Sequence, residues 1–141
     1  MRLNRTSDFA LRLMMLLAGT EQPISIEGAA ARLRIPRSQV MKIAAVLSAS
    51  GFVGTRRGRG GGIRLQKPAS EVRIGAVVRA VENDLGVVDC LRSGPCECVF
   101  LPRCGLMRAM SGATDSFLDH LDRFTLSDVA SRTGQPAPVA L

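Results

Sequence analysis

Four cysteines lie close together in the second half of the chain, and their type and spacing point to a specific chemistry. They are Cys90, Cys96, Cys98 and Cys104, which gives the spacing C-x5-C-x-C-x5-C. Zinc sites usually contain C-x2-C pairs, whereas iron–sulfur clusters are held by grouped cysteine thiolates. The spacing therefore indicates three thiolates around one inorganic cluster. Because the sequence has a single histidine and no further cysteine, a fourth ligand must be an oxygen group, a water or a group from another chain.

The middle ligand stays open at this point, because Cys96 and Cys98 are too close in sequence for both to belong to an evenly spaced triad. Cys104 is expected just inside the start of a long helix, where the helix dipole favours the net negative charge of a cluster. The alternative is a thiol switch without a cluster, in which Cys96, Cys98 or their neighbours form disulfides on oxidation. Residues 1–5 lack the apolar stretch of a secretory signal, so we expect a cytoplasmic protein with reduced cysteines.

Positive charge is concentrated in the first half of the chain. The 141 residues carry a net charge of +7, and 17 of the 19 basic residues are arginine. Residues 1–79 contain 14 Lys or Arg against 4 Asp or Glu, while residues 80–141 contain 5 against 8. A basic module joined to a mildly acidic one is typical of a protein that binds nucleic acid and carries a second function. With one histidine and no evident acid–base pair, an enzyme is not expected, and no apolar run is long enough for a membrane-spanning helix.

The spacing of apolar residues in the basic half predicts three helices. The first is capped by Ser7 and ends at Gly19, the second begins at Ser25, and the third runs from Pro36 to about residue 50, before Gly51. Two short helices joined by a tight turn indicate a helix-turn-helix, whose second helix places its first turn in the major groove. The residues expected to read DNA from this turn are Arg37, Ser38, Gln39 and, one turn on, Lys42.

A β-hairpin is expected next, because residues 52–55 and 63–65 are strand-like and the stretch between them is rich in glycine. A hairpin directly after the third helix gives the order of a winged helix-turn-helix domain. Three arginines stand at its tip, Arg56, Arg57 and Arg59, where they can contact the DNA backbone or a narrow minor groove.

The acidic half is predicted to hold a fourth helix near residues 74–82, an irregular segment, and a long helix from Pro102 to about Arg123. The long helix has a broad apolar stripe, formed by Leu106, Met110, Ala113, Phe117, Leu118 and Leu121. One small domain does not need so much apolar surface, so part of the stripe is expected to form a dimer interface. Thr125 is expected to cap a last short helix.

These expectations combine into a mainly α fold with a small β-hairpin, in which a long C-terminal dimerisation helix follows a winged helix-turn-helix domain. The expected parts are a DNA-binding domain over residues 1–82, a cysteine-rich cluster-binding loop over 83–104, a dimerisation helix with a short terminal helix over 105–133, and a disordered tail over 134–141. The expected partners are a second copy of the chain and a double-stranded DNA operator with an imperfect palindrome.

The sequence resembles the bacterial winged-helix regulators that carry an iron–sulfur cluster, typified by NsrR, IscR and RirA. The resemblance covers about residues 1–130 and rests on the opening residues 1–3, the segment Asp8-Phe9-Ala10-Leu11-Arg12, the wing residues 57–62, residues 67–69 and the cysteine loop. A His that follows the last cysteine in IscR-like members is missing from residues 105–107, while Asp8 and Arg12 fit the NsrR type.

The resemblance to the NsrR type implies a homodimeric repressor that senses nitric oxide through a 4Fe–4S cluster, with 2Fe–2S as the alternative. The implied ligands are Cys90, Cys98, Cys104 and Asp8 of the partner subunit, with Arg12 in support. The gap from Cys90 to Cys98 is longer than usual for this type and Cys96 is extra, so Cys96 remains an alternative ligand. The same fold sensing iron availability or redox state, as in RirA-like proteins, is the alternative function.

Overall fold

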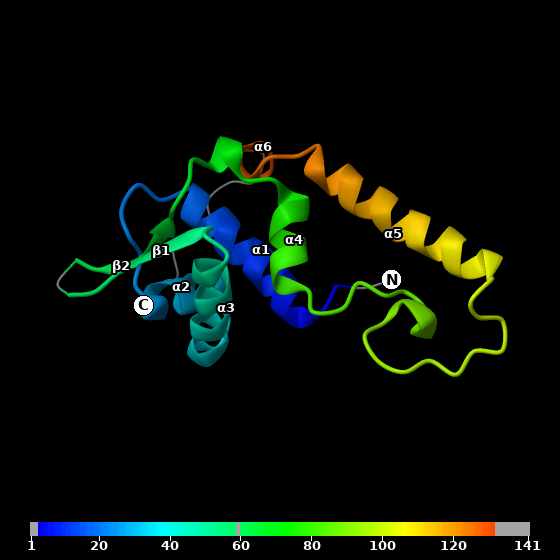
Figure 1. The fold of residues 1–141 in the computed structure, drawn as a ribbon. Helices are drawn as coiled ribbons and strands as arrows, with labels where there is room; N and C mark the ends of the chain where they lie inside the picture. Colours follow the sequence, from blue (N-terminus) through cyan, green and yellow to red (C-terminus); the bar gives the residue numbers. More distant parts are fainter. Residues whose placement is uncertain (1–2, 59, 132–141) are drawn as a thin grey trace.

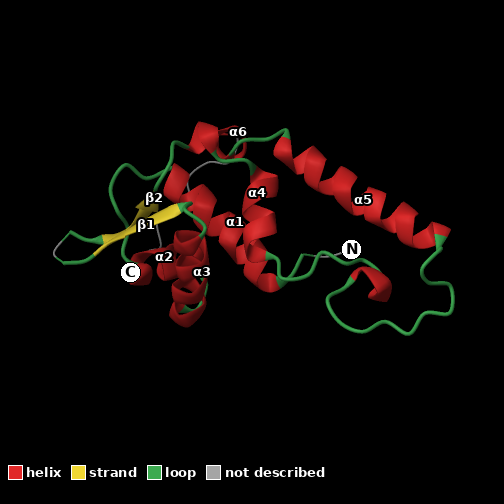
Figure 2. Cartoon of the chain, in the orientation of Figure 1, coloured by secondary structure: helices red, strands yellow, loops and turns green. Residues whose placement is uncertain are grey.

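In the part of the chain that the structure describes, helices make up most of the fold, and one hairpin lies among them (Figures 1 and 2). The computed structural model describes residues 3–58 and 60–131. The helices are α1 Arg5–Ala18, α2 Ile26–Leu33, α3 Arg37–Ala49, α4 Ile74–Val81, α5 Gly105–Asp122 and α6 Leu126–Ser131, and the strands are β1 Val53–Arg56 and β2 Gly62–Leu65. Two single turns of 3-10 helix, Ala69–Glu71 and Asp89–Leu91, complete the described elements. The expected mainly α fold with a small hairpin is confirmed.

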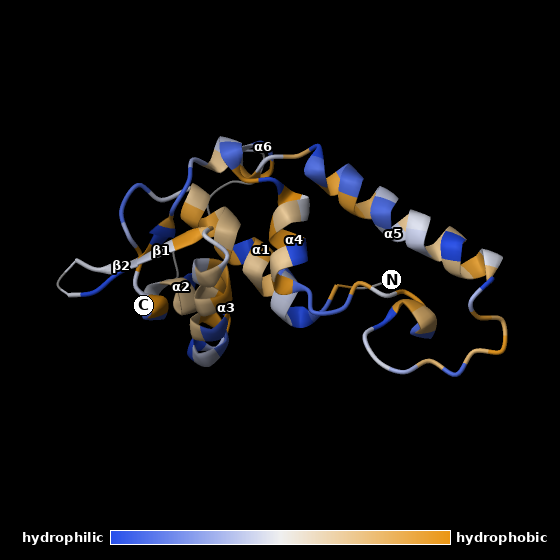
Figure 3. Cartoon of the chain, in the orientation of Figure 1, coloured by the Kyte–Doolittle hydropathy of each residue, from blue (hydrophilic) through white to orange (hydrophobic). Residues whose placement is uncertain are grey.

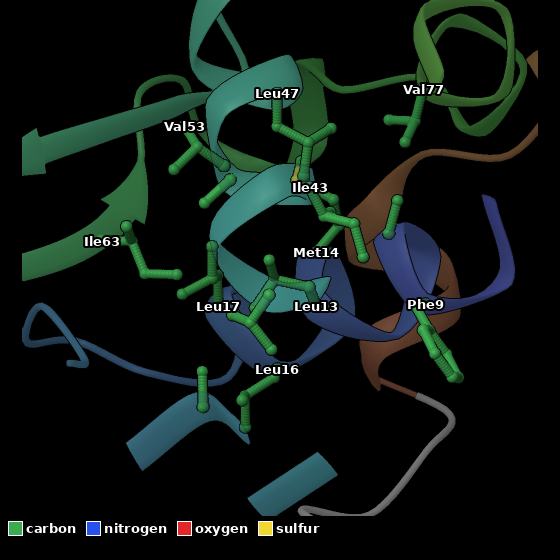
Figure 4. Packing of buried hydrophobic residues seen from close by; sticks show 14 of the residues in the cluster. Phe9, Leu13, Met14, Leu16, Leu17, Ile43, Leu47, Val53, Ile63 and Val77 are labelled. Atoms are coloured by element: carbon green, nitrogen blue, oxygen red, sulfur yellow. The ribbon is translucent and has the colours of Figure 1, made fainter. Parts of the chain in front are cut away.

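The core lies between α1, α3, α4 and the inner face of the hairpin. From α1, Leu13, Met14 and Leu17 are almost completely buried, and they belong to the same cluster as Ile43 of α3 and Val77 of α4 (Figure 4). Burial of each large aliphatic side chain contributes roughly 1.5–3 kcal/mol. These residues therefore fix the position of α3, whose opposite face remains exposed.

The start of α1 differs from the sequence expectation. Asn4 caps the helix in place of Ser7, because the Asn4 side chain accepts a hydrogen bond of 2.8 Å from the Ser7 backbone N–H. Ser7 is buried, and its hydroxyl donates to the carboxylate of Glu82 at 2.5 Å. Glu82 also accepts from the backbone and side-chain nitrogens of Asn4. A carboxylate at the end of α4 thus satisfies free donors at the N-terminus of α1.

The helix-turn-helix forms between α2 and α3 as expected. Ser25 caps α2 by accepting a 3.0 Å hydrogen bond from the Gly28 N–H. Arg34 closes α2 in the left-handed conformation with φ 54°. Pro36 stands one residue before α3 rather than inside it, and Gly51 follows α3 with φ 74°, a value that glycine adopts without strain.

The wing is an antiparallel hairpin with Val53 opposite Leu65 and Arg56 opposite Gly62. Val53 and Ile63 are buried against the core. Ile63 also exchanges two backbone hydrogen bonds with Ile24, of 3.0 and 2.8 Å, so the hairpin is tied to the segment before α2. The wing therefore has a fixed inner face and a solvent-facing outer face.

The long helix α5 is joined to the body at its C-terminal end (Figure 1). Backbone hydrogen bonds connect Ile74 to Phe124 and Leu126 to Val72, and Arg79 forms a 2.7 Å ion pair with Asp122. Leu118 is the only residue of α5 that is buried. The N-terminal part of α5 extends away from the helices of the core, and the cysteine loop precedes it.

The start of α5 also differs from the expectation. The helix begins at Gly105, three residues after Pro102, so Pro102 does not open it. Cys104 is the residue before the first helical turn and not inside it. At the other end, Thr125 and Asp128 cap α6 reciprocally, as the Thr125 N–H donates to Asp128 and the Asp128 N–H donates to the Thr125 hydroxyl. The tail expected over 134–141 lies outside the described residues.

Candidate DNA-binding surface and cysteine cavity

The exposed face of α3 carries the residues predicted to read DNA. Arg37, Ser38 and Lys42 are exposed, and Gln39 is half-buried. The end of α3 that holds them is hydrophilic in Figure 3, while the other side of the helix is apolar and faces the core. The structure thus gathers these four side chains at the free end of the helix.

Arg37 has an acidic partner that the sequence analysis did not identify. Its Nε atom donates to Oε1 of Glu27 in the first turn of α2 at 2.6 Å. The two side chains are 60% and 62% exposed, so the pair lies at the surface. The hydrogen bond from Arg37 lowers the pKa of Glu27, because it stabilises the charged form of this carboxylate. The first turns of both helices of the motif are therefore linked by charge.

Basic residues of the wing are found along its outer face and not only at its tip. Arg56 and Arg57 are exposed as expected, while Arg59 lies outside the described residues. The strand register places Arg64 opposite Gly54, on the same side of the hairpin as Arg56. These two arginines line a shallow pocket of about 620 Å³ together with Lys67. The alternation of apolar and polar side chains in β2 is the sequence signal that could have identified Arg64 as an outward-facing basic residue.

The four cysteines line one cavity between the 3-10 turn at Asp89–Leu91 and the start of α5. Its volume is about 900 Å³, and all four cysteines are free and half-buried. Cys90 lies in the 3-10 turn and Cys104 directly before α5. Two neighbours of the cavity are strongly exposed apolar side chains, since Val99 is 90% and Phe100 is 71% accessible. Segments on both sides of the irregular loop thus contribute thiols to the lining of the same cavity.

The thiols share the cavity without converging on a single point. Burial raises the pKa of the Cys90 thiol, and the neighbouring Cys96 raises it further. Within residues 3–58 and 60–131, no three Cys, His, Asp or Glu side chains are close enough together to hold a metal ion. Cysteine thiolates are the donors that iron–sulfur clusters use, and the structure places all four at this one cavity.

Asp8 and Arg12 lie on α1 and do not line the cysteine cavity as the structure describes it. They form a side-on ion pair, in which Arg12 contacts the Asp8 carboxylate through Nη2 at 2.8 Å and through Nε at 3.2 Å. Both side chains are about half exposed. The pair keeps the carboxylate at the surface of α1, where a second molecule can reach it.

A second acidic residue that the sequence analysis missed orders the segment before the cysteines. Asp84 accepts hydrogen bonds from the Gly86 backbone N–H at 2.8 Å and from Arg92 Nε at 3.3 Å. The bond from Gly86 is the main cause of the lowered pKa of Asp84. Gly86 has no room for a side chain, because an added Cβ would lie 2.6 Å from the Leu91 backbone. This tight turn sets the position of the 3-10 turn that holds Cys90.

Comparison with known proteins decides the family. The model of the family Rrf2, described as an iron-dependent transcriptional regulator, matches residues 3–132. The chain belongs to the Rrf2 family. A relative from Bacillus licheniformis, named HTH-type transcriptional regulator NsrR, is 35% identical over 92% of each chain. The protein of the same name from Geobacillus kaustophilus is 39% identical over 92% of this chain and 89% of its own.

Solved structures share the fold of this chain. The global cysteine regulator CymR of B. subtilis matches with a TM-score of 0.75 and 22% identity, over 94% of this chain and 98% of its own. T. potens IscR matches with a TM-score of 0.76 and 20% identity, over 100% of this chain and 94% of its own. The resemblance to this family is therefore confirmed. The protein is a DNA-binding transcriptional regulator and not an enzyme, and none of its described helices is long and apolar enough to cross a membrane.

Proposed function

We propose that this Rrf2 regulator is a cytoplasmic, homodimeric repressor whose operator binding is controlled by an iron–sulfur cluster that senses nitric oxide. The observation that carries the proposal is the single cavity lined by all four cysteines. It opens in the loop between the DNA-binding helices and α5, in a chain whose relatives are named NsrR. In this proposal, residues 1–82 bind DNA, residues 83–104 hold the cluster, residues 105–133 form the dimer, and residues 134–141 are the tail.

Cys90, Cys98 and Cys104 are the proposed thiolate ligands, and Asp8 of the partner subunit is the proposed fourth. The cysteines fit because soft thiolates from one loop are the donors that iron–sulfur clusters use, and 4Fe–4S is the type we favour over 2Fe–2S. Cys96 is the alternative middle ligand. When bound, the cluster supplies iron that nitric oxide can attack. Arg12 holds the Asp8 carboxylate in place from the next turn of α1.

The dimer is supported by the apolar side of α5. Leu106 is 59% exposed, and Met110, Ala113 and Phe117 follow at helical spacing on the same side of α5 without becoming buried. An exposed stripe of this length on a helix that extends from the domain is suited to pairing with a second copy. Two copies related by a two-fold axis bring each cysteine loop near α1 of the other subunit.

DNA binding follows from the two basic elements. Each α3 enters a major groove with Arg37, Ser38, Gln39 and Lys42, and the two copies read the halves of an imperfect palindrome. The wing contacts backbone or minor groove through Arg56, Arg57 and Arg59, and Arg64 and Lys67 add to the same surface. Arginine suits guanine and glutamine suits adenine among the base edges.

The residues that link the two sites are those at the N-terminus of α1. Glu82 lies between α4 and the cysteine loop, and its carboxylate accepts hydrogen bonds from Asn4 and Ser7 at the start of α1. Asp8 stands one turn further along the same helix. When the partner's cysteine loop releases Asp8, the contact between the two subunits changes. The spacing of the two α3 helices changes with it. A coupling of about 1–3 kcal/mol changes operator affinity by one to two decades.

The test is a titration of anaerobically purified protein with nitric oxide, in which the visible absorption spectrum and operator binding are followed together. We expect an iron–sulfur absorption band that bleaches as DNA is released. A band that ignores nitric oxide and falls on iron chelation would instead establish the RirA-like function. Absence of iron, with DNA binding governed by thiol oxidation, would establish the thiol switch and contradict the cluster proposal.

A further inference from the structure

Among the residues that the structure describes, the pair between Glu27 and Arg37 is the only hydrogen bond or ion pair that joins a predicted base-reading side chain of α3 to another helix. Each partner stands in the first turn of its helix, Glu27 in α2 and Arg37 in α3. In a helix-turn-helix, the first helix crosses the phosphate backbone while the start of the second enters the groove. The pair therefore lies where the protein passes from phosphates to bases.

The atoms used by the pair leave part of the guanidinium available. Glu27 accepts from Nε of Arg37, at the side of the guanidinium nearest the chain. The Arg37 side chain is 60% exposed, so solvent or DNA can reach its guanidinium while the contact through Nε is kept. Arginine reads guanine by donating two parallel hydrogen bonds to O6 and N7. A guanidinium held through Nε can do this with its terminal pair of nitrogens.

The charge of Glu27 has a second effect. A carboxylate close to the DNA backbone repels phosphates, so an acid at the start of α2 weakens binding to any sequence alike. Arg37 compensates this charge while the pair is intact, and the pair in turn keeps the arginine from moving to a phosphate. An arginine that is held away from phosphates forms hydrogen bonds to DNA only where a guanine lies within its reach.

We propose that Glu27 is a positioning residue that orients Arg37 toward guanine in the major groove and thereby raises sequence discrimination. This inference rests on the proposed function, because it requires α3 to be the helix that reads DNA. Glu27 touches no base itself. It acts by fixing the direction of the guanidinium and by making non-specific contact with phosphates unfavourable.

The experiment uses the full chain with its cluster and duplexes that the wild-type protein enriches from a random-sequence pool. Each guanine of an enriched duplex is replaced in turn by 7-deazaguanine, which lacks the N7 acceptor but pairs normally. We expect the wild type to lose about tenfold in affinity at one guanine per half-site. Arg37→Ala should lose this sensitivity, and Glu27→Gln should reduce it to about threefold or less.

A second readout separates orientation from a merely structural role. On a random-sequence duplex, Glu27→Gln should bind more tightly than wild type, and its salt dependence should steepen by about one unit as Arg37 gains a phosphate contact. Asp119→Asn on the exposed side of α5 removes the same charge far from the pair and serves as the control. It should keep both the guanine sensitivity and the salt dependence of the wild type.

The possible outcomes separate the role of Glu27 from the proposed sequence-specific DNA binding. Guanine sensitivity that survives unchanged in Glu27→Gln, or that persists in Arg37→Ala, overturns the role of Glu27 while sequence-specific DNA binding stands. A pool that yields no enriched duplex at all overturns the proposed sequence-specific function, and the role of Glu27 with it. Reduced sensitivity in Glu27→Gln with a normal Asp119→Asn control supports the proposal.

Discussion

At the scale of single residues, the cysteine loop contains two candidates for the middle ligand of the proposed cluster. Cys96 and Cys98 are separated by one residue and line the same cavity, so burial alone does not distinguish them. The interval from Cys98 to Cys104 equals that from Cys90 to Cys96, which is why spacing left the choice open. The proposed ligand set uses Cys98, and it makes the two cysteines unequal in a way that can be measured.

We expect Cys98→Ala to abolish the iron–sulfur absorption of anaerobically purified protein, because a thiolate ligand is lost. Cys96→Ala should keep the absorption and the iron content, and it is the matched control in the same loop. Iron and sulfide analysis with visible spectroscopy measures both. An intact cluster in Cys98→Ala together with its loss in Cys96→Ala would show that Cys96 is the middle ligand.

Glu82 is the second position at which one side chain has a large effect. Its carboxylate accepts three hydrogen bonds from Asn4 and the buried Ser7. Glu82→Ala leaves these donors without an acceptor, so we expect a loss of about 2 kcal/mol in the free energy of unfolding. Urea unfolding measures it. Glu71→Ala, at an exposed acid, should change stability by less than about 0.5 kcal/mol, and an equal effect of both would contradict this reading.

Among the elements, the crossing of α4 and α5 positions the long helix. Gly75 of α4 lies so close to α5 that an added Cβ would collide with the Asp122 carboxylate and lie 2.8 Å from the Leu118 carbonyl oxygen. The Arg79–Asp122 ion pair lies at the same crossing. A glycine here allows the two helices to approach, and the direction of α5 depends on this approach.

Gly75→Ala should therefore destabilise the protein by about 1–3 kcal/mol, because the helices must move apart. Gly112→Ala is the matched control in α5, since an added Cβ there meets nothing within 4 Å. It should stabilise the helix by about 0.5–1 kcal/mol through the lower backbone entropy of the unfolded chain. Thermal unfolding of both variants measures the difference. Two changes of the same sign would contradict the close crossing.

For the whole molecule, the apolar side of α5 leaves the single chain incomplete. Leu118 is buried, but the rest of the stripe toward the cysteine loop remains accessible. The same arrangement leaves Val99 and Phe100 exposed beside the cysteines. A second copy packed along α5 would cover this surface and place its own α1 near the loop.

We expect Ala113→Glu to give a folded monomer, because Ala113 is exposed in the single chain and a charge would be buried only in the dimer. Its operator affinity should fall by about 100-fold, since two linked half-site contacts become independent. Ser111→Glu, on another side of α5, is the control. Analytical ultracentrifugation and fluorescence anisotropy measure both properties, and a dimeric Ala113→Glu would contradict the proposed interface.

Local patterns in the sequence predicted most of the elements correctly. The errors concern the ends of helices, which depend on residues far away in the sequence. The helix-turn-helix, the wing and α4 follow from apolar spacing and from turn residues such as Ser25 and Gly51. Asn4 and Ser7 are both good caps, and the choice between them depends on Glu82, which is 75 residues from Ser7 in the sequence. The start of α5 was expected at Pro102, but the helix begins at Gly105.

The sequence by itself determined the class of protein: the periodicity of its helices, its basic half and its grouped cysteines are local properties that can be read over a few residues. Only the tertiary structure joined Glu27 to Arg37 and brought four cysteines to one cavity. These contacts join segments whose relative positions depend on packing of the core. A side chain's type shows what it can bind, and packing decides which group it meets.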